Sequence, residues 1–351
     1  MNYESCLIKS DSTIAQAIAL LDSSIYKIVL VVDEQKKLLG TITDGDVRRG
    51  ILKGFSLQDP VGKIMAVQPV VAAEKALMSK VAALMHQHTI KQVPRVNELG
   101  QVVGLEISPD LIGTGKKDNF VILMAGGLGT RLRPLTNDKP KPMLSVGEKP
   151  ILETIISNFA EQGFHKIFLS LNYKAEQIRD HFGNGRELGV EIEYLLEEER
   201  LGTAGAISLI TQKTDLPILV MNADLLTKVS FADLLNSHKL HNAVATMCVR
   251  EYEFQVPFGV VGIENEQIVN IDEKPVHKFF VNAGIYALNP EVQGRIPKNQ
   301  YLDMPALFNQ LVSEKQSTLA FPIREYWIDI GQHSDFAQAQ SDFPGIFSDK
   351  K

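Results

Sequence analysis

The segment from Asn119 to Pro150, NFVILMAGGLGTRLRPLTNDKPKPMLSVGEKP, organises the rest of the chain. Its apolar start, Phe120 to Met124, has the length and composition of a buried strand. A glycine-dense turn, Ala125 to Arg131, follows directly. Glycines let backbone N–H groups approach an anion closely, and ligands of open α/β sheets lie at the carboxyl ends of strands. With Arg131 and Lys141 as cations, this turn is predicted to bind the phosphates of a nucleotide.

The turn differs from two better-known phosphate-binding motifs. It lacks the G-x-x-x-x-G-K-[ST] string of P-loop enzymes and does not complete the G-x-G-x-x-G string of dinucleotide folds. The whole string M-A-G-G-L-G-T-R-L-R-P-L-T-N-D-K-P-K-P, however, resembles the signature of sugar-1-phosphate nucleotidylyltransferases. This resemblance implies nucleotide binding by Ala125, Gly126, Gly127, Gly129 and Thr130.

Length and composition fit a soluble enzyme with two domains. The chain has 351 residues, 44% of them hydrophobic, and a net charge of −6 without a basic cluster, which argues against a nucleic-acid partner. Its two cysteines, Cys6 and Cys248, give no disulfide framework and fit a reducing compartment. No leader and no run of about 18 apolar residues occurs. We therefore expect a cytoplasmic protein without a membrane partner.

The first part of the chain, residues 1–114, contains an internal repeat with copies at about 1–55 and 60–114. Each copy has an amphipathic helix followed by two strands. Gly40 of the first copy corresponds to Gly104 of the second, and Asp46 corresponds to Asp110 at the same offset.

The string G-T-I-T-D-G-D, Gly40 to Asp46, gives this part its resemblance to a tandem CBS (β-α-β) domain pair. In that family, a threonine or serine and an aspartate at these spacings hold the ribose of an adenine nucleotide. Thr43 and Asp46 match, whereas the second copy keeps Asp110 but has Ile107 in place of the threonine. The resemblance implies at most one complete nucleotide site per chain. A dimerisation module without a nucleotide is the alternative.

Residues 118–345 form the second predicted domain, after a short linker around residues 113–118. Strands and helices alternate there, which is typical of a doubly wound α/β fold with a mostly parallel sheet. The resemblance specifies a Rossmann-like nucleotidyltransferase domain. Helices are predicted at 151–159 and 175–182, and strands at 166–171, 190–195, 217–221 and 268–272.

Asp224 follows the apolar strand 217–221, at the sheet edge where the glycine-rich turn is expected. A helix cap is the commonest role for such an aspartate, but this position favours metal binding. The resemblance assigns a second metal carboxylate to Asp329 of the string Y-W-I-D-I-G. Two carboxylates together with phosphates suit Mg²⁺, which prefers oxygen ligands and keeps several waters.

The sugar phosphate is assigned only through the resemblance. In the family, the lysine of an E-K-P string holds the sugar phosphate and its glutamate accepts from sugar hydroxyls, which implies Lys274 and Glu273. Gly259 and Asn282 lie in strings that resemble other sugar-contacting segments. A solvated surface pair is the common role of adjacent glutamate and lysine.

In relatives the loop that precedes the L-G-T-A-G string recognises the base, and the resemblance implies nucleotide binding by Gly202, Thr203 and Gly205. The acidic run before it begins at Glu197. A carboxylate can accept from both N1–H and the exocyclic amine of guanine, which uracil and thymine do not offer, so GTP is the favoured nucleotide. The alternative is that this acidic run is a solvent-exposed loop without a role in base recognition.

The roles implied for the catalytic residues are electrostatic. Arg131 would hold the β- and γ-phosphates, Lys141 would bridge the α-phosphate and the attacking phosphate, and Mg²⁺ would lie on Asp224 and Asp329. With a fused CBS pair, the string also resembles glucosamine-1-phosphate guanylyltransferases of legionaminic acid synthesis, a bacterial surface-sugar pathway.

Three hypotheses follow. The first is a GDP-sugar-forming enzyme of nucleotide-sugar biosynthesis, regulated by adenine nucleotide at the CBS pair. The second is the same chemistry with mannose- or heptose-1-phosphate, or with thymidylyl or uridylyl transfer. The third is a non-catalytic nucleotide sensor. CBS pairs commonly associate face to face, so a homo-oligomer is expected by analogy.

Overall fold

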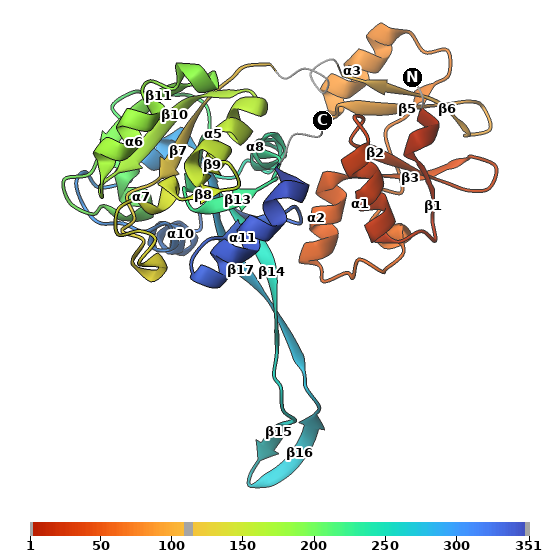
Figure 1. Cartoon of the computed structure of the whole chain (residues 1–351). Coiled ribbons are helices and arrows are strands. Elements are labelled where there is room, and N and C mark those ends of the chain that lie inside the picture. Colours follow the sequence, from red (N-terminus) through yellow and green to blue (C-terminus); the bar gives the residue numbers. More distant parts are fainter. Residues whose placement is uncertain (1–2, 109–114, 348–351) are drawn as a thin grey trace. The chain divides into compact units, whose positions relative to one another are not determined.

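The computed structural model describes residues 3–108 and 115–347 (Figure 1). The chain divides into two compact units, Met1–Gly115 and Lys116–Lys351, and each has its own hydrophobic core. Within the described residues, no helix is long and apolar enough to cross a lipid bilayer.

The first unit contains one arrangement twice. In the first copy β2 (Ile28–Val32) pairs with β3 (Leu38–Thr43), and in the second β5 (Gln92–Val96) pairs with β6 (Val102–Ile107), both antiparallel. The registers agree at an offset of 64 residues, because the pair Ile28–Thr43 recurs as Gln92–Ile107. The remaining elements are β1 (Leu7–Lys9), α1 (Ile14–Ser23), α2 (Asp44–Leu52), β4 (Ala72–Ala73) and α3 (Met78–His88).

The second unit is built on a seven-stranded sheet of order β11-β10-β7-β12-β17-β14-β18. The pairings β11–β10, β10–β7, β7–β12 and β14–β18 are parallel, whereas β17 runs antiparallel to both of its neighbours. The predicted α/β class with a mostly parallel sheet is therefore confirmed. The strands are β7 (Lys117–Met124), β10 (Phe164–Leu171), β11 (Glu191–Leu196), β12 (Ile218–Asn222), β14 (Ala245–Gln255), β17 (Val276–Leu288) and β18 (Thr318–Pro322).

Helices cover both faces of this sheet (Figure 1). In β7, Val121 and Leu123 pack on one side with α5, α6 and α8, whereas Phe120 and Ile122 pack on the other with α10. Successive side chains of a strand point to opposite faces of the sheet, and both faces are covered here. The sequence of β7 is therefore a continuous apolar run. The helices are α5 (Ile151–Glu161), α6 (Ala175–Phe182), α7 (Gly202–Gly205), α8 (Phe231–Leu240), α9 (Pro290–Gln293), α10 (Met304–Ser313) and α11 (His333–Ile346).

Phe159 of α5 is central to this core. It is fully buried, stacks on Phe231 with ring centroids 3.9 Å apart, and meets Phe164 edge to face at 5.8 Å. We expect Phe159→Ala to reduce the free energy of unfolding by about 3–5 kcal/mol, because it removes a large side chain from a packed site. The single tryptophan, Trp327, lies in this unit and reports its urea unfolding by fluorescence. Leu240→Ala, at a side chain 60% exposed, is the control and should change little.

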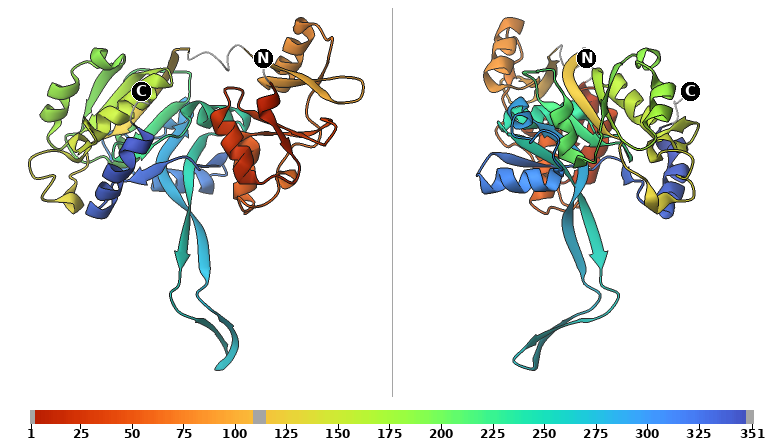
Figure 2. Two further views of the ribbon diagram at one scale, coloured as in Figure 1. Left: turned by 45° about the vertical axis from the view of Figure 1, so that its right-hand side comes forward. Right: turned by 90° about the vertical axis from the view of Figure 1, so that its left-hand side faces the viewer.

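A two-stranded arm leaves the sheet. β14 and β17 stay paired with each other as far as Gln255 and Val276, well past their other neighbours, and a hairpin of β15 (Val260–Glu264) and β16 (Gln267–Asp272) forms the tip. Two further views show the arm standing clear of the rest of the second unit (Figure 2). The strand predicted at 268–272 is thus part of this tip. Two small pairings complete the unit, β8 (Ser145–Val146) with β9 (Lys149–Pro150) and β13 (Leu225–Thr227) with β19 (Trp327–Asp329).

Candidate active site

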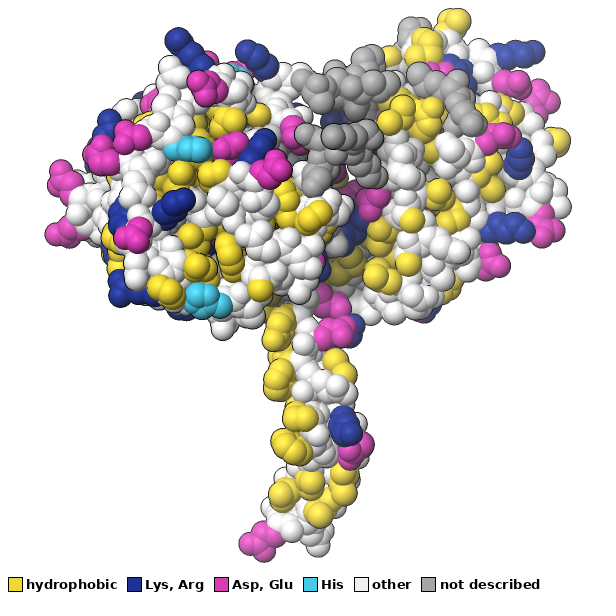
Figure 3. All heavy atoms as spheres, viewed as in Figure 1, with side chains coloured by type: hydrophobic (Ala, Val, Ile, Leu, Met, Phe, Trp, Pro, Cys, Tyr) yellow, Lys and Arg dark blue, Asp and Glu magenta, His cyan; other side chains and the backbone are white. Residues whose placement is uncertain are grey.

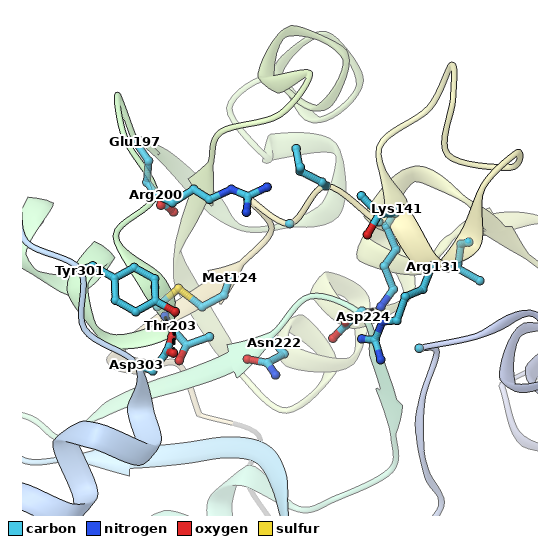
Figure 4. A pocket seen from close by; sticks show the side chains of 18 residues that line it. Met124, Arg131, Lys141, Glu197, Arg200, Thr203, Asn222, Asp224, Tyr301 and Asp303 are labelled. Carbon is cyan, nitrogen blue, oxygen red and sulfur yellow. Dashed lines mark hydrogen bonds and ion pairs between the residues drawn. The ribbon is translucent and has the colours of Figure 1, made fainter.

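A pocket of about 470 Å³ lies at the carboxyl ends of β7 and β12 (Figure 4). It brings together the glycine-rich turn after β7, the end of β12, and segments near residues 200 and 302 that are far apart in the sequence. The lining residues are Met124, Gly126, Gly127, Leu128, Gly129, Thr130, Arg131, Leu132, Lys141, Glu197, Arg200, Gly202, Thr203, Asn222, Asp224, Tyr301, Asp303 and Gly331.

Gly129 fixes the shape of the glycine-rich turn. Its φ is +62°, in the left-handed region, and a Cβ there would lie 2.9 Å from Thr136 Cγ2 and 3.1 Å from Lys141 Cβ. Thr136 Oγ1 also donates to the Gly129 carbonyl over 2.8 Å. The turn is therefore packed against the segment that carries Lys141.

Gly129→Ala should destabilise the second unit by about 1–3 kcal/mol, because it combines a strained φ with a steric overlap. Gly127→Ala is the matched control two residues earlier, since a Cβ on Gly127 has no neighbour within 4 Å. Urea unfolding followed by Trp327 fluorescence compares the two. Equal stability of the two variants would contradict the packing described for Gly129.

Lys141 and Asp224 form an ion pair at the centre of the pocket. Lys141 Nζ lies 2.5 Å from Asp224 Oδ2, and the lysine is only 7% exposed. The short helical turn Lys141–Met143 holds the lysine from one side, and Asp224 follows β12 on the other. Removing either partner of a buried ion pair is strongly destabilising, because the other charge is then left uncompensated.

Asp329 lies beside this pair. Strand β19 places it opposite Leu225 of β13, and the backbone N–H of Ile330 donates to the Asp224 carbonyl over 3.1 Å. Although part of its side chain reaches solvent, desolvation raises the pKa of the Asp329 carboxyl. The nearby Asp224 carboxylate raises that pKa further, whereas Lys141 and Arg131 oppose the shift. Two carboxylates are thus close enough to repel each other.

These two carboxylates fit a divalent cation. Asp224 Oδ1 is buried without a hydrogen-bond partner among the described residues, and so is Asn222 Oδ1 beside the same pocket. An unpaired buried carboxylate oxygen is costly, and a hard cation with oxygen ligands would satisfy it. Asp224 therefore fits a divalent cation, whereas Asp329 is not among the lining residues and its part in the Mg²⁺ site stays a prediction.

Two further cations face the pocket with solvent access. Arg131, in the helical turn Thr130–Leu132, lines the pocket next to Gly331, and Arg200 lines the opposite side (Figure 4). Neither side chain has an ion-pair partner within residues 3–108 and 115–347. Both guanidinium groups are therefore available to anionic ligands.

The side of the pocket next to Arg200 is held together by the segment before α10. Asp303 Oδ2 accepts from the Tyr301 hydroxyl over 2.6 Å, and Thr203 Oγ1 accepts from the Met304 backbone N–H over 2.9 Å. Gly202 has φ +76°, and a Cβ there would lie 2.7 Å from the Leu302 carbonyl oxygen. Gly202 and Thr203 thus dock the L-G-T-A-G segment on this connection, and Gly205, outside the lining, makes a similar close approach to Gln300.

Glu197 is engaged within the protein. Its Oε1 contacts the Ser170 hydroxyl, and its Oε2 accepts from the Leu201 backbone N–H over 2.9 Å. The carboxylate therefore ties the end of β10 to the L-G-T-A-G segment. If the Glu197 carboxylate is to accept hydrogen bonds from a nucleotide base, it must give up one of these two hydrogen bonds within the protein.

Several predicted site residues lie outside the pocket lining. Ala125 is buried just behind the glycine-rich turn. Asn282 donates to the Tyr286 hydroxyl over 2.8 Å and accepts from the Gly284 backbone N–H. Gly259, Glu273 and Lys274 lie on the arm. The structure does not bring these three residues to the pocket of their own chain.

In the first unit, Thr43 and Asp46 contact each other. Asp46 Oδ2 accepts from the Thr43 backbone N–H over 2.8 Å and from its hydroxyl over 2.7 Å, and Asp46 Oδ1 accepts from Arg49. This arrangement caps α2, which begins at Asp44. Asp110 lies outside the described residues.

Sequence reasoning did not identify Asn222, Arg200, Tyr301 or Asp303 as lining residues. Asn222 lies two residues before Asp224, and Arg200 directly precedes the L-G-T-A-G string, so their proximity in sequence was a usable signal. Tyr301 and Asp303 belong to an irregular connection before α10 and carry no motif. Only the fold places them opposite the glycine-rich turn.

Residues 120–344 match the nucleotidyl transferase family. The chain belongs to this family. Residues 3–53 match the CBS domain, which accounts for the first copy of the repeat. The enzyme class predicted from the glycine-rich turn and the CBS resemblance of the first copy are thus confirmed at the level of family.

Curated relatives share the transferase part. Mannose-1-phosphate guanyltransferase of Yarrowia lipolytica is 36% identical over 224 residues, which are 61% of this chain and 61% of that protein. The catalytic subunit beta of mannose-1-phosphate guanylyltransferase from Drosophila melanogaster is 34% identical over 233 residues, 64% of this chain and 62% of its own length. The chain therefore spans about three fifths of the length of these relatives.

The solved structure of HddC from Yersinia pseudotuberculosis is also similar. It is 27% identical with a TM-score of 0.52 and covers 64% of this chain and 99% of its own. A second structure of that protein, complexed with GMP-PN, is similar at 26% identity and a TM-score of 0.51, with coverages of 64% and 99%.

Proposed function

We propose that this chain transfers a guanylyl group from GTP to a sugar-1-phosphate and releases pyrophosphate, with Mg²⁺ as cofactor. The observation that carries the proposal is the pocket itself. The glycine-rich turn, Arg131, Lys141 and Asp224 come from separate segments and meet at the carboxyl ends of β7 and β12. Ligands of open α/β sheets bind at this edge.

The reaction needs positioning and charge neutralisation more than acid–base chemistry. An oxygen of the sugar phosphate forms a new bond to the α-phosphorus, the bond from that phosphorus to the bridging oxygen breaks, and pyrophosphate leaves with the electron pair. Arg131, free of ion pairs with described residues, holds the β- and γ-phosphates. Lys141 offsets the repulsion between the two reacting phosphates. Bound at Asp224 and Asp329, Mg²⁺ would supply further charge neutralisation for the phosphate oxygens.

The choice of base and sugar rests on relatives and resemblance. Guanine is supported by the guanylyltransferase activity for which the relatives are named and by the GMP-PN complex of HddC. Glucosamine-1-phosphate is the acceptor implied by the likeness to enzymes of legionaminic acid synthesis. Mannose-1-phosphate is the second candidate, favoured by the names of the curated relatives.

The CBS part is proposed to regulate this activity through an adenine nucleotide at Thr43 and Asp46. Thr43 and Asp46 hydrogen-bond to each other, so a ligand that binds both residues must replace these hydrogen bonds with its own. Stimulation or inhibition by AMP or ATP in wild type, lost in Asp46→Ala, would support such a site.

The test is pyrophosphate release by the full chain with Mg²⁺, crossing GTP, UTP, dTTP, CTP and ATP against glucosamine-, mannose- and glucose-1-phosphate. We expect GTP to exceed every other nucleotide, and the better of glucosamine- and mannose-1-phosphate then identifies the acceptor. A different nucleotide would remove the guanylyl assignment but keep the chemistry. No release with any pair, in folded protein, would favour a non-catalytic nucleotide sensor.

A further inference from the structure

The arm of the second unit exposes an apolar surface that nothing in its own domain covers. Of the large hydrophobic side chains that are exposed in the described chain, about half lie between residues 252 and 280. Figure 3 shows yellow side chains in patches along the length of the arm. An isolated two-stranded ribbon is marginally stable in water at best. We therefore expect another protein surface to cover the apolar side chains of the arm.

The stem of the arm has one ion-paired face and one aromatic face. Lys278 Nζ lies 3.0 Å from Glu251 and 2.7 Å from Glu253, which places these three side chains on one face. Because side chains alternate along a strand, the residues between them point the other way. That face carries Tyr252, Phe254, His277 and Phe279, with cross-strand pairs Tyr252–Phe279 and Phe254–His277.

The tip extends this surface. Val261 pairs with Ile271 across the hairpin, and Ile263 pairs with Ile268 after a register shift that leaves Val269 without a partner in the ladder. Their exposed fractions are 43% to 66%. An apolar patch of this extent marks an interaction site on a soluble protein.

The arm starts beside the pocket but ends far from it. At its root, Gly284 lies against Asn222, since a Cβ on Gly284 would be 2.8 Å from Asn222 Nδ2. Six residue steps of about 3.4 Å then separate Val249 from Gln255, so the ladder carries the chain about 20 Å beyond the sheet. Lys274, next to the end of this ladder, cannot reach the pocket of its own chain while the strands stay paired.

The charged side chains that line the pocket balance one another. Arg131, Lys141 and Arg200 line the pocket together with the three carboxylates of Glu197, Asp224 and Asp303, so the lining has no net positive charge for substrates that carry several negative charges. Glu273 and Lys274 are exposed and have no ion-pair partner within the described residues. Lys274 would add a cation for a phosphate group, and the adjacent Glu273 would add a hydrogen-bond acceptor, so the two together leave the net charge of the pocket unchanged.

We propose that two copies of this chain exchange arms, so that Lys274 and Glu273 of the partner subunit complete each pocket. The root of the arm and the pocket share one edge of the sheet. In a twofold-symmetric dimer, two such edges would face each other, and each arm would lie along the pocket edge of the other chain. The aromatic faces of both arms would then be buried in a self-complementary contact. The role of Lys274 rests on the proposed function, whereas the contact between chains does not.

Complementation tests the exchange. Asp224→Asn removes a carboxylate from the pocket and keeps the arm, and Lys274→Ala alters the arm and keeps the pocket. The two inactive proteins are co-expressed with different affinity tags in equal amounts. If arms are exchanged, one pocket in each mixed dimer is intact, and random pairing restores about a quarter of wild-type activity. Activity no higher than that of the separate variants would overturn the exchange.

Cross-linking tests the same contact without activity. The photoreactive residue p-benzoylphenylalanine replaces Phe254 on the aromatic face, or Glu253 on the opposite face as the matched control. Equal amounts of ¹⁴N and ¹⁵N chains are co-assembled before irradiation. We expect mixed-isotope cross-links from position 254 to residues 116–347, several-fold more than from position 253.

Cross-links within single chains only, or none from position 254, would overturn the proposal and indicate an arm folded on its own domain or bound elsewhere. Inactive wild-type protein that still forms mixed-isotope cross-links would remove the proposed function and leave the contact between chains. The two failures are therefore distinguishable.

Discussion

Asp224→Asn is expected to lower the rate of NDP-sugar formation by about 10²–10³-fold or more, the usual consequence of removing one preorganised charge from an active site. Asparagine keeps the size of the side chain and one oxygen for Lys141, so the fold should persist. What is lost is the negative charge that fits Mg²⁺, on a side chain whose Oδ1 is buried without a partner among the described residues. Initial rates at saturating Mg²⁺ and substrates measure the effect.

The matched control is Asp215→Asn, an exposed aspartate in the same unit. It should retain wild-type activity, and both variants should keep the unfolding transition reported by Trp327. Near-normal turnover of Asp224→Asn in folded protein would show that Asp224 is not part of the catalytic machinery.

Lys141→Met is expected to cause a loss of similar size, about 10²–10³-fold in kcat. Methionine fills the buried site, but the cation between the reacting phosphates is gone and Asp224 loses its ion-pair partner. Lys139→Met, two residues earlier and exposed, is the control and should change kcat little. Steady-state kinetics with both substrates varied separates an effect on kcat from one on KM.

The pair Lys141–Asp224 also predicts non-additivity. Because the two side chains contact each other, the double variant should lose less activity than the product of the two single losses. Strictly multiplicative losses would indicate that the two residues act independently, against the geometry of the pocket.

Local patterns were sufficient to predict the α/β class of the second unit and the repeat in the first. The apolar run before the glycine-rich turn became β7, an interior strand of the sheet, because a doubly covered parallel strand has no polar face. The repeat was visible because Gly40 and Asp46 recur at an offset of 64 residues, and the strand registers of the two copies follow the same offset. Such signals depend only on short stretches of sequence.

The candidate site was only partly predictable. Arg131, Lys141 and Asp224 belong to recognisable strings, and the structure brings them to one pocket. Tyr301 and Asp303 come from an irregular connection whose position depends on tertiary packing. Glu273 and Lys274 match a family string, yet the sequence gives no sign that β14 and β17 continue as a free ladder and carry these residues away from their own pocket.

Isotope tracing tests the central claim most directly. The full chain is incubated with Mg²⁺, GTP and a sugar-1-phosphate labelled with ¹⁸O in its phosphoryl oxygens, and the products are analysed by mass spectrometry. If the sugar phosphate attacks the α-phosphorus, all of the label appears in the NDP-sugar and none in pyrophosphate. Label in pyrophosphate, or no NDP-sugar from folded protein, would contradict a nucleotidyl transfer in this pocket.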